Sequence, residues 1–114
     1  MKPQRRALTV IERRAHDHFK AAVHALLGDN LVALRLFGSR ARAEGTSESD
    51  IDVLVLVRVR DAALCRRIVE IALDVDLAYD TNVAPCILTT AEYDLNREYG
   101  TPFYRNVETE GRPL

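Results

Sequence analysis

The spacing of apolar residues predicts two long helices in the first two thirds of the chain. After Thr9 and Glu12, which have the spacing of a capping box, apolar residues recur every three to four positions until Gly28 ends the pattern. The second helix follows Asp61, a suitable N-cap, and keeps the same period as far as Tyr79. The expected buried stripe of the first helix is Leu8, Ile11, Ala15, Phe19, Ala22, Val23 and Leu26.

Three mainly apolar runs predict strands at 31–37, 51–59 and 83–88. The middle run does not alternate between apolar and polar positions, which is typical of a central strand covered on both faces. Pro85 in the last run has no backbone N–H to donate. We therefore expect this strand at an edge of the sheet, or with a bulge.

Shorter helices complete the predicted order of elements. Ser39 is expected to open one helix after the first strand, and Thr89 or Thr90 to cap another. A break at Gly100 precedes a final helix over residues 103–110. The predicted fold class is α/β (α+β), a small mixed β-sheet with helices packed on it.

The composition of the chain limits the number of domains and the kinds of partner to be expected. With 114 residues, 47% of them hydrophobic and 29% charged, the chain is expected to form a single domain over residues 1–114. A net charge of −1 gives no bulk attraction to long nucleic acid. The two cysteines, Cys65 and Cys86, are expected to be reduced thiols, and no apolar run is long enough to cross a bilayer. We therefore expect a cytoplasmic protein that does not bind membranes.

Two carboxylates, Asp50 and Asp52, stand at the beginning of the most apolar strand. Alternate side chains of a strand point to the same face, so these two project together while Ile51 points away. Side by side they repel each other, and one takes up a proton unless a cation neutralises the pair. Because Mg²⁺ is commonly held by one or two carboxylates together with substrate phosphates, the pair predicts a Mg²⁺ site.

The Gly38-Ser39 step before this strand predicts an anion site. Gly38 allows close approach of a ligand to the backbone, and the free N–H groups of a helix that begins at Ser39 favour a phosphate. Arg40 and Arg42 add positive charge to the same turn, although either also suits a solvated loop. Each feature alone is compatible with an ordinary turn and edge charges, whereas the combination predicts a nucleoside triphosphate site.

The stretch from Leu36 to Val53 resembles the signature of the nucleotidyltransferase superfamily typified by DNA polymerase β: an apolar residue, Gly-Ser, a spacer and Asp-x-Asp. The form Gly-Ser-Arg-Ala-Arg followed by Ser-Asp-Ile-Asp looks most like the minimal nucleotidyltransferases, many of which are antitoxins of HEPN-domain proteins. The segment from Thr101 to Gly111 is also similar to that family's tail. By this resemblance the site residues are Asp50 and Asp52 for catalysis and metal, and Gly38, Ser39, Arg40, Arg42 and Ser49 for the nucleotide.

The resemblance implies a Mg²⁺-dependent enzyme that transfers a nucleoside monophosphate, AMP from ATP, to a hydroxyl of a partner protein. The implied partner is a HEPN-domain toxin, and self-association of the chain is left open. The second hypothesis is an antitoxin that binds its HEPN partner sterically and keeps the motif only to bind nucleotide. A third, a small-molecule nucleotidyltransferase, is disfavoured because the chain has no room for an acceptor domain.

The chain departs from the family pattern at the third carboxylate. Active members usually carry it on the strand after the second long helix, and the run 82–88 contains no acid. We expect the acid's usual place to be Ala84 or a neighbour, beside Asp52. Asp80 is close enough in sequence to lean into the site, whereas Asp76 is expected to be solvated on the helix.

Three histidines lie on the first predicted helix, and none is predicted to be a metal ligand. His16 and His18 are two positions apart and face different directions, so they cannot form a ligand pair on a helix. We expect His16, His18 and His24 to be solvated or half-buried.

Overall fold

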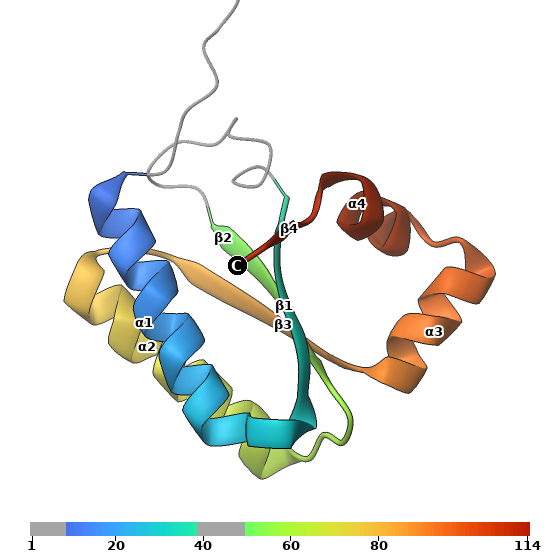
Figure 1. Ribbon diagram of the computed structural model, residues 1–114, viewed down its shortest axis with the longest axis horizontal. Helices are drawn as coiled ribbons and strands as arrows, with labels where there is room; N and C mark the ends of the chain where they lie inside the picture. The colour runs from blue at the N-terminus through green and yellow to red at the C-terminus, as the bar shows by residue number, and fades with distance from the viewer. Residues whose placement is uncertain (1–8, 39–49) are drawn as a thin grey trace, which may run out of the picture.

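The computed structural model describes residues 9–38 and 50–114. These residues form one sheet with helices on both of its faces (Figure 1). The elements in chain order are α1 (Val10–Leu27), a 3₁₀ turn (Gly28–Asn30), β1 (Leu31–Phe37), β2 (Ile51–Val57), α2 (Ala62–Tyr79), β3 (Val83–Thr89), α3 (Thr90–Tyr99), α4 (Pro102–Glu110) and β4 (Arg112–Pro113).

The sheet is mixed, as predicted, with the strand order β3-β2-β1-β4. β2 is central: it pairs antiparallel with β1 and parallel with β3. β3 lies at the edge, which confirms the position expected from Pro85, since an edge strand can lack one ladder hydrogen bond. The pattern did not predict β4, whose two residues pair with Arg35 and Leu36 of β1 and are too few to show a period.

The helices form a layer on each face of the sheet (Figure 1). α1 and α2 cover one face, where the odd-numbered residues of β2 pack with Phe19, Ile68 and Val75 in the main core. α3 and α4 lie on the other side, toward which the even-numbered residues of β2 point, among them Asp52 and Leu54. Leu54 is almost fully buried, so both faces of β2 are covered, as predicted for a central strand.

Local hydrogen bonds explain where the elements begin and end. Thr9 caps α1 by accepting from the Glu12 N–H at 3.1 Å, and Asp61 caps α2 by accepting from the Leu64 N–H at 2.8 Å. β2 is two residues shorter than predicted because Asn30 takes the place of a strand partner: its Oδ1 accepts from the N–H groups of both residues 58 and 59.

The buried face of α1 differs from the predicted stripe. Ile11 is exposed, and the buried positions include Glu12 and His16 in addition to the apolar Phe19 and Val23. The expectation that His16 is solvated or half-buried is therefore wrong, although His18 and His24 are exposed. Leu8, also assigned to the stripe, lies outside the described residues. In the part of the chain that the structure describes, no helix is long and apolar enough to span a membrane.

Candidate active site

The carboxylate pair lies at one end of the sheet, where three strands contribute to it. Asp52 is opposite Phe37 of β1 and opposite Ala84 of β3. Asp50 directly precedes β2, and Gly38 directly follows β1. Because β1 runs antiparallel to β2 and β3 runs parallel to it, the end of β1 meets the beginnings of β2 and β3 at this edge. The topology thus brings Gly38, Asp50 and Asp52 together, as predicted.

Asp50 and Asp52 differ in their surroundings. Asp50 is exposed, whereas Asp52 is partly buried on the face of the sheet opposite the main core. Burial raises the pKa of the Asp52 carboxyl above its usual value, and the neighbouring Asp50 carboxylate raises it further. This repulsion is what a divalent cation would relieve, and carboxylate oxygens are the ligands that Mg²⁺ prefers. The residues present therefore fit a Mg²⁺ ion.

Gly38 has a structural role that the sequence pattern did not specify. Its φ of +77° lies in the left-handed region that side chains rarely adopt. A Cβ at this position would collide with the Oδ2 atom of Asp52. The turn after β1 thus comes into direct contact with the carboxylate, and only glycine leaves room for it.

No third carboxylate joins the pair within the described residues. Ala84 is the residue opposite Asp52, which confirms the register expected for the family's third acid. Asp80 is exposed at the C-cap of α2, with a φ of 54°. Nowhere in residues 9–38 and 50–114 do three His, Cys, Asp or Glu side chains gather as a metal site.

Asp76 is a structural residue rather than a solvated one. Its Oδ1 accepts from the Thr81 hydroxyl at 3.0 Å and from the Val83 N–H at 2.8 Å. It therefore fixes the turn from α2 into β3, and with it the start of the strand that carries Ala84. The expectation that Asp76 is solvated is wrong because its carboxylate replaces a backbone acceptor in this turn.

Two further side chains near the pair were missed by reasoning from the sequence. Cys86 pairs with Leu54, two positions along β3 from the Ala84–Asp52 pair, so its thiol lies on the same face of the sheet as Asp52. Burial raises the pKa of this thiol, and the Asp52 carboxylate raises it further. The sequence carried a signal for this position, because Cys86 is two residues after Ala84 and alternate side chains of a strand share a face. Phe103 of α4 packs edge-on against Phe37, with ring centroids 5.5 Å apart, and no local signal in the sequence predicts that contact.

The remaining predicted nucleotide-binding residues lie outside the described residues. These are Ser39, Arg40, Arg42 and Ser49. The roles expected of them stay predictions, and so does the short helix expected to begin at Ser39.

The fold and the paired carboxylates define a class of protein: a nucleotidyltransferase. A family model described as "Nucleotidyltransferase domain" matches residues 17–101, and the chain belongs to this family. Among its relatives is "Putative protein adenylyltransferase MJ0141" of Methanocaldococcus jannaschii. It is 36% identical over 87 residues, which cover 72% of this chain and 88% of that protein.

Solved structures support the same fold. A crystal structure of the toxin-antitoxin MntA-HpeT has a TM-score of 0.55 at 26% identity and covers 86% of this chain and 70% of that one. A structure described as a "putative minimal nucleotidyltransferase" has a TM-score of 0.56 at 24% identity and covers 95% of this chain and 99% of that one. These structures confirm the predicted fold, and the family match confirms the predicted enzyme class.

Proposed function

We propose that this protein is a Mg²⁺-dependent nucleotidyltransferase that transfers AMP from ATP to a hydroxyl of a partner protein. The observation that carries the proposal is the contact between Gly38 and the Asp52 carboxylate, beside Asp50, in a chain of the nucleotidyltransferase family. ATP is the proposed donor because a relative in M. jannaschii is named "Putative protein adenylyltransferase MJ0141".

The reaction is an in-line displacement at phosphorus. The acceptor oxygen forms a bond to the α-phosphorus of ATP while the bond to pyrophosphate breaks, and the hydroxyl proton passes to a base. Asp50 and Asp52 would hold Mg²⁺, which when bound neutralises charge on the phosphates. Gly38 has no side chain that would displace the Asp52 carboxylate, so this carboxylate can lie directly beside the turn that we assign to the phosphates.

The base for this proton is not evident among the described residues. Ala84 stands where a third acid would face Asp52, and the nearby Cys86 thiol has a raised pKa, which disfavours the thiolate. We infer that the acceptor protein or water receives the proton, so the isolated chain reacts slowly. We propose that a partner also supplies the surface that binds the acceptor, because residues 9–38 and 50–114 form a single sheet with its covering helices.

The partner that we propose is a toxin with a HEPN domain, with this chain as its cytoplasmic antitoxin. The support is the likeness to a crystal structure of the toxin-antitoxin MntA-HpeT. A second candidate function is an antitoxin that only binds its partner and the nucleotide. The observation that favours it is the apolar Ala84 opposite Asp52.

Labelled ATP separates these two functions. The protein is mixed with a candidate HEPN-domain toxin and with ATP labelled at the α-phosphate. We expect label on the toxin with the wild type and none with Asp52→Asn, while Asp80→Asn, which changes an exposed carboxylate at the C-cap of α2, keeps the transfer. Toxin neutralisation that survives Asp50→Asn/Asp52→Asn without any label would instead establish the binding function. Rapid transfer by the isolated chain to a small alcohol would contradict both.

A further inference from the structure

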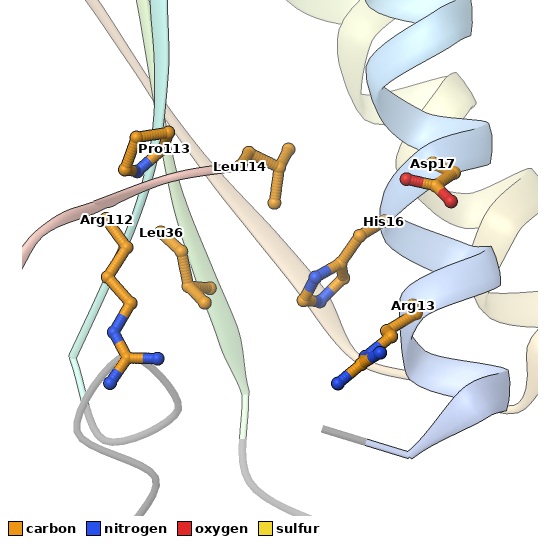
Figure 2. Close-up of a pocket in the computed structure, with 7 residues that line it drawn as sticks. All are labelled: Arg13, His16, Asp17, Leu36, Arg112, Pro113 and Leu114. Atoms are coloured by element: carbon orange, nitrogen blue, oxygen red, sulfur yellow. The ribbon is translucent and has the colours of Figure 1, made fainter. Parts of the chain in front are cut away.

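A cavity of about 280 Å³ lies on the face of the sheet opposite Asp52. It is bounded by Arg13, His16 and Asp17 of α1, by Leu36 of β1 and by residues 112–114 (Figure 2). The cavity therefore lies between the first helix and the short strand β4 and is open to solvent on one side.

The sheet separates this cavity from the candidate active site. Leu36 pairs with Val53, and both belong to the core that α1 and α2 cover. The next pair along the strands is Phe37 and Asp52, whose side chains point to the other face. A ligand in the cavity is thus not the nucleotide whose phosphates we assign to Gly38.

His16 is the unusual residue of the cavity. Its side chain is only 7% exposed, and its Nε2 atom has no hydrogen-bond partner among the described residues. Burial lowers the pKa of the imidazole, while Asp17 acts in the opposite direction. A buried nitrogen without a partner is costly, and such atoms in native proteins are generally satisfied by water or by a ligand.

Two arginines face the same space from opposite walls. Arg13 lies one helical turn before His16 on α1, and Arg112 belongs to β4. Figure 2 shows both guanidinium groups at one end of the cavity, with the imidazole between the two walls. Asp17 lies on the other side of the imidazole, away from the guanidinium groups. Within the described residues neither arginine takes part in an ion pair.

We propose that this cavity binds a small ligand with a phosphate or carboxylate group, independently of nucleotidyl transfer. The anionic group is held between Arg13 and Arg112, because guanidinium groups bind phosphates and carboxylates alike with charge-assisted hydrogen bonds. His16 donates a third hydrogen bond from Nε2, in the neutral tautomer that carries its proton there. Leu36 and the apolar residues Pro113 and Leu114 line the rest of the cavity and accommodate an apolar part of the ligand.

Histidine NMR of the full chain tests this directly. The Cε1–H signals are followed at pH 7.5 and constant ionic strength during titration with inorganic phosphate, and separately with acetate. We expect a saturable shift of the His16 signal. His18 and His24, exposed on the same helix, are internal controls and shift only with bulk conditions. Arg13→Gln and Arg112→Gln should each weaken the affinity about tenfold, the loss of one hydrogen bond to a charged group. Arg14→Gln, an exposed neighbour outside the cavity, should not.

The separate titrations with phosphate and with acetate show which anionic group the cavity binds. Saturation with phosphate alone assigns a phosphate ligand, and saturation with acetate alone assigns a carboxylate. A wild-type His16 signal that responds to neither, or only as His18 does, overturns the proposal and leaves a buried water as the partner of Nε2. The proposal is also overturned if Arg13→Lys, which keeps the positive charge, and Arg13→Gln, which removes it, bind the anion with equal affinity. Asp52→Asn should leave this titration unchanged, so failure here is distinguishable from failure of the proposed enzymatic function.

Discussion

The direction of the Asp52 carboxylate depends on the missing side chain of Gly38. The backbone there has a φ of +77°, and a Cβ would collide with Asp52 Oδ2. Two separate costs therefore oppose any other residue at this position: strain of the left-handed backbone and displacement of the carboxylate. Chemistry alone would explain a glycine beside a phosphate, whereas the fold shows that this glycine also makes room for Asp52.

Gly38→Ala is predicted to destabilise the fold by more than the backbone strain of about 1–3 kcal/mol. Gly100→Ala is the matched control, because Gly100 has a φ of +58° and no heavy atom within 4 Å of its would-be Cβ. Denaturant unfolding measures the loss in the free energy of unfolding for Gly38→Ala and for Gly100→Ala. In an Asp52→Ala background, the cost of Gly38→Ala should fall to that of the control. Equal costs of Gly38→Ala in the two backgrounds would show that the contact with Asp52 is not restrictive.

Asp52→Asn is predicted to raise the free energy of unfolding at pH 7 when no metal is present. The folded state raises the pKa of Asp52, so the unfolded state binds fewer protons between the usual pKa and the raised one, and stability falls as the pH rises through that window. The gain from Asp52→Asn should therefore vanish below the usual pKa of the carboxyl. Thermal unfolding at several pH values measures it, and a gain that persists in acid would contradict this origin.

Mg-ATP should stabilise the wild type but not the double variant Asp50→Asn/Asp52→Asn, in which both proposed metal-binding carboxylates are neutral amides. At one hundred times its dissociation constant, a ligand stabilises the folded state by about 2.7 kcal/mol. Wild type should show this gain in thermal unfolding, and Asp50→Asn/Asp52→Asn should lose it while remaining folded. Equal stabilisation of both proteins by Mg-ATP would place the metal elsewhere.

At the scale of elements, helix ends were predictable because capping is local. Thr89 accepts from the Glu92 N–H at 3.1 Å while Glu92 Oε1 accepts from the Thr89 N–H at 3.0 Å, a complete capping box for α3. Arg60 adds a link from the end of β2, since it contacts Glu92 at 2.8 Å and donates to the Ile87 carbonyl at 2.7 Å. The length of β2, by contrast, depends on Asn30, which is distant in sequence and gives no local signal.

Thr89→Ala is predicted to cost about 1 kcal/mol of stability, the usual value of a lost N-cap. Thr90→Ala is the matched control: Thr90 is the first residue of α3, its side chain has no capping role, and alanine is the better helix former. Urea unfolding of the two variants measures the difference. If Thr90→Ala cost as much as Thr89→Ala, the hydrogen bonds of the capping box would not be the cause.

At the scale of the whole molecule, the site combines segments that are far apart in the sequence. The spacing of Asp50 and Asp52 in the sequence was enough to predict a carboxylate pair at one end of the central strand. The family pattern placed the third acid at Ala84 or a neighbour, and Ala84 is the residue opposite Asp52. What could not be predicted depends on tertiary contacts. The burial of His16 follows from how α1 is rotated against the sheet, and the position of Phe103 follows from how α4 docks on β1.

Ala84→Asp tests whether the missing carboxylate limits the reaction. The register places residue 84 beside Asp52 on the same face, and Ala84 is only partly buried, so an aspartate can be accommodated there. Without metal, a third negative charge should lower the free energy of unfolding at pH 7 through repulsion with Asp52. Ala84→Asn is the control, because asparagine has nearly the shape of aspartate without its charge, and it should not show that repulsion.

With Mg-ATP and the toxin partner, Ala84→Asp should transfer label faster than wild type. The gain should be tenfold or more if general-base catalysis is restored, since such catalysis typically contributes about 10²–10⁴-fold. A folded Ala84→Asp protein that is no faster than Ala84→Asn would show that the proton acceptor of this enzyme comes from elsewhere.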